Sequence, residues 1–294
     1  MSALLRKPAM FGAAIAAAVV LAFGILCASP AAAMADDGAA LSAQQELSTQ
    51  GTVSVPVITK MVNKTEGYIG DTGLETITST YAIKYNSNGQ IKNYKETTKS
   101  SLGEEWFNHS FTYNKKGQFV NSKTSSSVED AYEFTYKLDK KGRVKSAFLG
   151  TDLSAAYKYN AQGYVSKDES GMNNSFTWND DGTLQKTVIG YGDDYNSFSY
   201  KYDARGNFKK VVEQASWPEE EPSVITYKNK YNGDLLKKRV EKDGSGEVLN
   251  ECTFTYKTIE VPEEFAAQVK AQQKWLKFLE ISSYGIPPLE GMYL

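Results

Sequence analysis

Histidine and cysteine are scarce in this 294-residue chain, which has one histidine, His109, and two cysteines, Cys27 and Cys252. These residues cannot supply the four nitrogen or sulfur ligands of a closed structural zinc site. A catalytic Cys–His pair is not excluded by composition. However, Cys252 alternates with Phe254 and Tyr256 along an expected strand, which is typical of a buried, unreactive thiol. We therefore expect no metal and no cofactor.

Other signatures of catalysis are also missing. The sequence has no G-x-S-x-G nucleophile elbow and no phosphate-binding glycine loop. The segment WNDDGT resembles a calcium loop, but Thr177 occupies the first ligand position and no glutamate occupies the twelfth. A glycosidase needs only two carboxylates, and a chain with 35 acidic residues always has some close pair. We predict that the protein is not an enzyme, and a glycan-active enzyme is the third-ranked interpretation.

The formal net charge is only −2, so the sequence lacks the basic surplus that is typical of nucleic-acid-binding domains. Long apolar runs are absent after the first 35 residues, which predicts no membrane span in the mature chain. We expect no nucleic-acid partner and no membrane span after cleavage of the signal.

The N-terminus has the order of a secretory signal. Two basic residues at positions 6–7 precede an apolar run over residues 9–28, and small residues follow up to an A-x-A site ending at Ala35. Cleavage near Ala35 predicts a secreted or cell-envelope protein, whereas an uncleaved anchor is the alternative. The expected organisation is a signal peptide (1–35), a flexible linker (36–52), a repeat domain (53–260) and a C-terminal helix with a tail (261–294).

A short phrase recurs through the repeat domain: YNSNGQI at 85, YNKKGQF at 113, YNAQGYV at 159, WNDDGTL at 178 and YDARGNF at 202. Aligning the repeats on glycine gives seven anchors spaced 19 to 28 residues apart, namely Gly89, Gly117, Gly142, Gly163, Gly182, Gly206 and Gly233. An apolar residue stands two positions after each glycine. Large apolar or aromatic residues stand six positions before every glycine and four before most.

This pattern predicts a β-hairpin. Residues at −6 and −4 share one face of a strand, because strand side chains alternate with a period of two. Asn or Asp at −3 can open a turn by bonding forward to the backbone, and glycine suits the left-handed position that closes a three-residue loop with a bulge. The phrase resembles the YD repeats of bacterial secreted and surface proteins, including the Rhs family, over roughly residues 81–256. The resemblance implies successive hairpins in a curling sheet and an extracellular setting, and it implies no activity.

Seven hairpins with flanking strands near residues 55–62 and 251–260 predict about 14–16 strands. The expected fold is all-β: a long, twisted and curled antiparallel sheet with one aromatic face and one solvated face. The segment VPEEFAAQVKAQQKWLKFLEISS predicts a helix that begins at Pro262. Its apolar stripe includes Phe265, Trp275 and Leu279, with Gln268 and Gln272 as interruptions. We expect this helix to cover the aromatic face, with a detachable partner-binding or membrane-surface helix as the alternative.

Charge is divided between the two kinds of loop. The tight turns are basic, with Lys115, Lys116, Lys140, Lys141, Arg143 and Arg205, whereas the connections between repeats are acidic. Because two connections also carry tryptophan, the acidic edge is the predicted binding rim for cations, basic peptides or sugars. The candidate residues are Trp106, Asp193, Asp194, Trp217, Glu219, Glu220 and Glu221. Ordinary solvation of loops explains the same pattern without a ligand.

Two functions remain open. The first is an exported, non-catalytic binding module that engages an extracellular protein or glycan through its loops or its sheet face. The second is a carrier that holds a lipid or another apolar ligand between sheet and helix. A void under the helix would favour the carrier, and a filled interface would favour the binding module. We expect a monomer in either case.

Overall fold

The asparagine of each repeat phrase organises a tight turn. Asn86 Oδ1 accepts hydrogen bonds from the backbone N–H groups of Asn88 and Gln90, both at 3.0 Å. The seven repeat glycines have φ between 57° and 96°, the left-handed region that favours glycine. The strand register shifts beside the turn, between Lys84 and Tyr85 in the first repeat. The predicted three-residue hairpin with a bulge is confirmed.

The computed structural model describes residues 51–68, 74–169, 174–191, 194–217, 221–279, 285–287 and 289. Within these residues the chain forms sixteen β-strands and one α-helix. The first eight strands are β1 (Thr52–Tyr68), β2 (Leu74–Tyr85), β3 (Ile91–Ser100), β4 (Gly103–Tyr113), β5 (Phe119–Ser126), β6 (Tyr132–Leu138), β7 (Val144–Leu149) and β8 (Asp152–Tyr159). The others are β9 (Val165–Asp168), β10 (Asn174–Trp178), β11 (Leu184–Tyr191), β12 (Asp194–Tyr202), β13 (Phe208–Ala215), β14 (Ser223–Asn232), β15 (Leu235–Lys242) and β16 (Val248–Pro262). The helix is α1 (Glu263–Leu276).

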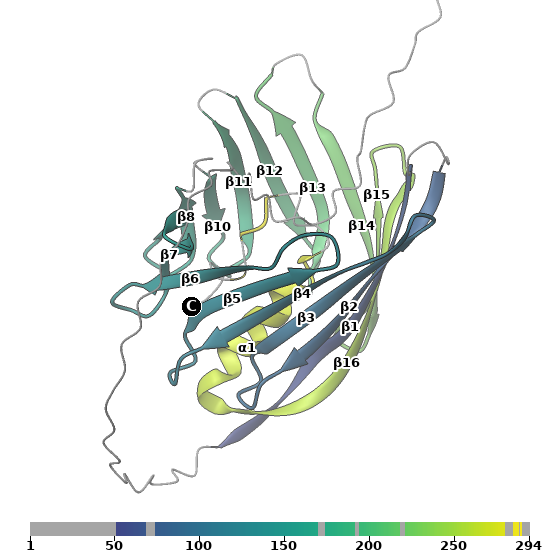
Figure 1. Ribbon diagram of the computed structural model, residues 1–294. Helices are drawn as coiled ribbons and strands as arrows, with labels where there is room; N and C mark the ends of the chain where they lie inside the picture. The colour runs from purple at the N-terminus through teal and green to yellow at the C-terminus, as the bar shows by residue number, and fades with distance from the viewer. Residues whose placement is uncertain are drawn as a thin grey trace, which may run out of the picture.

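The sheet is a closed antiparallel barrel, so the predicted open, curled sheet was wrong (Figure 1). Each strand pairs with its neighbours in sequence, and β1 also pairs with β16 from Thr52↔Pro262 to Thr65↔Asn250. An open sheet of this size would leave the backbone groups of two long edge strands unpaired. Closure pairs them and removes both edges. The predicted number of strands and the antiparallel pairing agree with the structure.

Side chains alternate between an apolar interior and a polar exterior. Most large residues at repeat positions −6 and +2 are buried, among them Tyr157, Phe176 and Phe208, and the others are half-buried. Lysine and threonine occupy most outward positions of the same strands, so the predicted division into an aromatic face and a solvated face holds for the barrel wall.

Aromatic residues at repeat position −4 also join consecutive repeats. The hydroxyl of Tyr113 donates to the Ile91 carbonyl at 2.8 Å, and Tyr202 donates to the Leu184 carbonyl at 2.8 Å. In the fifth repeat the indole N–H of Trp178 makes the equivalent bond to the Val165 carbonyl at 2.6 Å. Each acceptor belongs to the apolar residue two positions after the glycine of the preceding repeat. The bond explains why this position favours Tyr or Trp over a purely apolar side chain.

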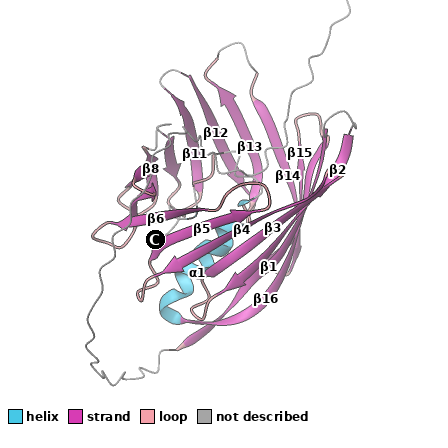
Figure 2. Cartoon of the chain, in the orientation of Figure 1, coloured by secondary structure: helices cyan, strands magenta, loops and turns pink. Residues whose placement is uncertain are grey.

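Helix α1 lies across the end of the barrel where the tight turns are (Figure 2). It follows β16 directly and crosses towards the opposite wall, where Lys274 Nζ donates to the Gly182 carbonyl at 3.2 Å. The glutamines that interrupt its apolar stripe bind the barrel. Gln272 Oε1 accepts from the Ile91 N–H at 2.8 Å, and Gln273 Oε1 accepts from the Ile58 N–H at 2.7 Å. The expected covering of aromatic side chains is present, since the Trp275 ring lies 6.4 Å from that of Tyr94.

The predicted signal peptide and nearly all of the predicted linker lie outside the described residues. Among the described residues, no helix is long and apolar enough to cross a membrane.

Candidate functional site

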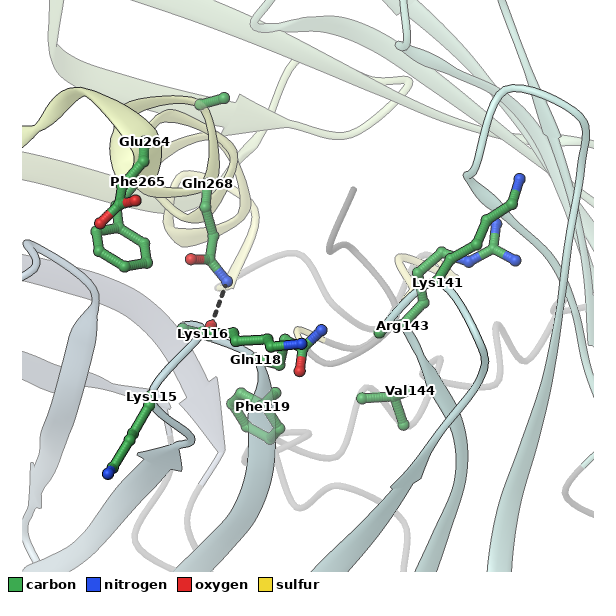
Figure 3. A pocket seen from close by; sticks show the side chains of 13 residues that line it. Lys115, Lys116, Gln118, Phe119, Lys141, Arg143, Val144, Glu264, Phe265 and Gln268 are labelled. Atoms are coloured by element: carbon green, nitrogen blue, oxygen red, sulfur yellow. Dashed lines mark hydrogen bonds between the residues drawn. The ribbon is translucent and has the colours of Figure 1, made fainter. Parts of the chain in front are cut away.

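A cleft of about 470 Å³ opens at the turn end of the barrel, between two neighbouring turns and the start of α1. The turn between β4 and β5 contributes Lys115, Lys116 and Gln118, and the turn between β6 and β7 contributes Lys141 and Arg143. The helix adds Glu264, Phe265 and Gln268 on a third side (Figure 3). The volume of the cleft is in the range of small-molecule sites.

Glycine shapes the walls of this cleft. A Cβ on Gly117 would lie 2.4 Å from the Phe265 ring, and one on Gly142 would lie 1.8 Å from Gln118 Nε2. Both glycines have positive φ. Glycine therefore serves two purposes here: it adopts the left-handed conformation that closes the turn, and its lack of a Cβ lets Phe265 or Gln118 approach the backbone closely. Gln268 Nε2 then donates to the Gly117 carbonyl at 2.9 Å and joins the helix to the turn.

The cleft is strongly cationic. Lys115, Lys116 and Lys141 are exposed, and none of them forms an ion pair within the described part of the chain. Arg143 is committed to its own turn, where Nε and Nη2 contact Asp139 Oδ2 at 2.8 and 2.6 Å. Although burial opposes the effect, hydrogen bonds from Arg143 and from the backbone hold the pKa of Asp139 below its usual value. Three ammonium groups therefore remain available to a ligand.

This arrangement suits recognition of an anionic group. Lysine ammonium groups bind phosphate, sulfate or carboxylate as point charges. The amides of Gln118 and Gln268 add polar contacts, and Phe119 and Phe265 provide apolar surface. Glu264 is the only carboxylate among the lining residues, so the cleft lacks the pair of acids that glycoside hydrolysis requires.

The sequence predicts a binding rim at the opposite, acidic end of the barrel. The basic residues of the tight turns are visible in the sequence, but that pattern alone does not indicate a cleft. What the sequence could not show is that α1 returns to the turn end and walls off a cleft beside only two of the seven repeat turns.

The acidic-rim candidates are only partly brought together. Trp217 is 58% exposed, and its Nε1 donates to Asp194 Oδ1 at 3.1 Å. Trp106 lies on β4, seven strands away by the shorter path around the barrel from β13, the strand that precedes Trp217. There Lys95 Nζ lies 5.1 Å from the Trp106 ring centroid. Glu221 is exposed, whereas Asp193, Glu219 and Glu220 lie outside the described residues. A binding role for this rim stays a prediction.

The contact between helix and wall is nearly filled. Between α1 and the strands around Phe208, the cavity is about 10 Å³, at the limit for a single water molecule. The Phe278 and Phe208 rings stack there at 4.4 Å. At this contact the helix packs on the wall without room for an apolar ligand, and the choice between binding module and carrier stays a prediction.

The two residues of the possible nucleophilic pair lie on different strands, with His109 partly buried and Cys252 fully buried. His109 on β4 stacks on Tyr94 at 4.5 Å, and its Nδ1 lies 3.0 Å from Thr124 Oγ1. Burial lowers the pKa of His109 to about 4. Cys252 on β16 is fully buried. No group of His, Cys, Asp or Glu within the described ranges is arranged to hold a metal ion.

Comparison with known proteins gives no sequence match and only distant structural matches. No protein-family model matches this chain, and no curated protein matches its sequence. A porin-like protein from Bacteroides uniformis is similar in structure over 68% of this chain and 98% of its own, with 12% identity and a TM-score of 0.41. The Photorhabdus luminescens Tc holotoxin pore matches over 63% of this chain and 10% of its own, with 14% identity and a TM-score of 0.35.

A TcdB2–TccC3 structure without its hypervariable C-terminal region matches over 58% of this chain, with 16% identity and a TM-score of 0.32. This chain spans only 9% of that structure. The predicted resemblance to YD-repeat proteins is therefore accompanied only by weak, partial structural matches to Tc toxin proteins, and no family model supports it. At these TM-scores none of the matches carries an argument about function.

Proposed function

We propose that the protein is an exported, non-catalytic binding module that recognises an anionic group of an extracellular glycan in the cleft at the turn end. The observation that carries the proposal is a cleft of about 470 Å³ with amides, aromatic surface and three exposed lysines, none of which is ion-paired to a described residue. Rigid hairpins and the helix pre-form the walls, so binding needs little ordering of the chain.

Placement outside the cytoplasm is part of the proposal and rests on the signal-like N-terminus. The outer wall supports a setting in water. Outward positions on the strands are rich in lysine and threonine, for example Lys257 and Thr253 on β16, while aromatic side chains face inward. A membrane-inserted barrel has the opposite alternation, with an apolar band outside and polar side chains inside.

The test compares glucose with two derivatives that carry an anionic group. Glucuronate and glucose 6-phosphate should shift amide signals around Lys116 and Lys141 in NMR titrations, whereas glucose at the same concentration should not. The double change Lys116→Gln and Lys141→Gln should weaken binding at least tenfold. A matched double change on β1 and β2, Lys64→Gln and Lys84→Gln, should leave it unaltered. Equal binding of glucose and the two acids would contradict the proposal.

A further inference from the structure

The outer wall opposite the cleft carries a concentrated group of lysines on five adjacent strands, β11 to β15. We define this lysine face by Lys186, Lys201, Lys209, Lys210, Lys228, Lys230, Lys237 and Lys238. All of them lie in the half of the wall nearest the tight turns. Within the described part of the chain, one ion pair involves the face and joins Lys238 to Glu251 of β16. Within the described residues of these five strands, the remaining lysines of the face have no carboxylate partner.

Strand register places like charges directly opposite each other. Lys201 of β12 faces Lys210 of β13, and Lys230 of β14 faces Lys238 of β15. Like charges in directly opposed positions destabilise an antiparallel pair. The two carboxylates that strands β13 and β15 do contain, Glu213 and Glu241, share the inward side with Phe198 and Tyr227, their register partners. The half of β11 to β15 nearest the tight turns therefore concentrates positive charge on its outer surface, and among its described residues only Lys238 has an acid partner, Glu251 of the neighbouring strand β16.

This concentration contrasts with the whole chain, whose net charge is −2. Positive charge is gathered on one wall while acids collect at the connections, so the field of this wall attracts anions although the molecule is slightly acidic. Adjacent strands are about 4.8 Å apart, so five strands span roughly 20 Å. A ligand that engages the whole face must be extended and must carry several anionic groups.

The chemistry of the face favours an acidic polysaccharide. Outward positions among these lysines hold small polar or aliphatic residues such as Ser199, Thr226 and Val212. Proteins that bind single-stranded nucleic acid stack bases on exposed aromatic side chains, and arginine is preferred for planar, bidentate phosphate contacts. The outward strand positions described in this half of the wall hold neither kind of residue. Arg205, in the adjoining turn between β12 and β13, stacks on Tyr231 and lies 3.7 Å from Asp234. Flexible lysines suit charges spaced irregularly along a sugar chain.

We infer that the lysine face is a docking surface for an acidic polysaccharide, separate from the cleft and independent of the function proposed for it. Several lysine ammonium groups contact the same polysaccharide chain, so their individually weak contacts combine into a higher overall affinity. Because each contact is electrostatic and exposed, binding must weaken steeply with salt.

Dextran sulfate and unsubstituted dextran of the same length provide the test with the full chain. Dextran sulfate should bind at low salt, and dextran should not. The quadruple change Lys201→Gln, Lys210→Gln, Lys228→Gln and Lys230→Gln should weaken binding at least tenfold and flatten its salt dependence. The control removes the same charge from β1, β2 and β5, outside the lysine face, through Lys60→Gln, Lys64→Gln, Lys84→Gln and Lys123→Gln, and should change binding less than threefold.

Equal losses in the two quadruple variants would overturn the lysine face as a site, because they would show attraction by overall charge alone. Tighter binding of a single-stranded oligonucleotide of equal charge would overturn the polysaccharide as the partner. Thermal melting checks that both variants fold. Changes in the cleft at Lys116 and Lys141 should leave dextran sulfate binding intact, so failure here is distinguishable from failure of the proposed cleft function.

Discussion

A single aromatic position explains much of the repeat phrase at the residue scale. The tyrosine four residues before the glycine buries its ring and still reaches a backbone carbonyl of the preceding repeat, as in Tyr159 to Val144 at 2.6 Å. A phenylalanine would bury the same ring but leave that carbonyl without this partner, at a cost of about 1 kcal/mol. The third repeat departs from the pattern, because Leu138 stands at this position.

His109 gives a pH-dependent prediction at the same scale. Its pKa is lowered to about 4 by burial, against about 6.5 in the unfolded chain, so unfolding takes up a proton between these values. Stability is therefore lost as the pH falls through this window. Between pH 7 and pH 5 the wild type should lose about 2 kcal/mol more than His109→Gln, measured by urea unfolding.

Glu96 titrates in the opposite sense, since burial raises its pKa despite hydrogen bonds from Tyr81 and Thr98. Its contribution to stability increases as the pH falls. Because Glu96 is present in both proteins, its effect cancels in the difference between wild type and His109→Gln. Parallel pH profiles for the two proteins would mean that His109 is not held neutral by burial.

At the scale of elements, the C-terminal helix is attached to the barrel by glutamine side chains as well as by apolar packing. Gln272 is almost fully buried, and its Nε2 also donates to the Tyr113 hydroxyl at 3.2 Å. Glutamine at this point caps the Ile91 N–H beside a β-bulge, a donor that the strand ladder leaves unused. The polar interruptions of the helical stripe are thus part of its interface.

Gln272→Met tests this attachment. Methionine nearly preserves the volume but leaves the Ile91 N–H without its acceptor, so the free energy of unfolding should fall by about 1–3 kcal/mol. Lys270→Met on the exposed side of α1 is the matched control and should change stability by less than about 0.5 kcal/mol. Chemical denaturation measures both. Similar losses in the two variants would argue against the buried hydrogen bond.

At the scale of the whole molecule, the pairing of β1 with β16 decides the architecture. These strands lie about 200 residues apart in sequence and pair over thirteen register positions. Ser54 faces Glu260 near one end of this seam. Directly opposed residues have Cα separations of about 4.5–5.5 Å, which suit a disulfide.

Ser54→Cys with Glu260→Cys, in a Cys27→Ser background, should therefore form a disulfide across the seam. The bond would close a loop of more than 200 residues and should raise stability by about 4–5 kcal/mol. Mass spectrometry of peptides and melting with and without reductant measure these effects. Ser54→Cys with Glu133→Cys on distant β6 should form no such bond. An open sheet would give no disulfide in either pair.

The repeat phrase by itself determined the local structure of this protein. The Asn-x-x-Gly turns and their bulges follow from short-range hydrogen bonding and from positive φ at glycine. The inward aromatic residues follow from side-chain alternation, and the helix start follows from the residues around Pro262. All of these effects act within about ten residues. Closure of the barrel and the cleft depended on tertiary structure. Pairing of β1 with β16, and the return of α1 to the turns at Gly117 and Gly142, join residues far apart in the chain. No local pattern specifies those contacts, because they arise only when accumulated twist brings the first and last strands together.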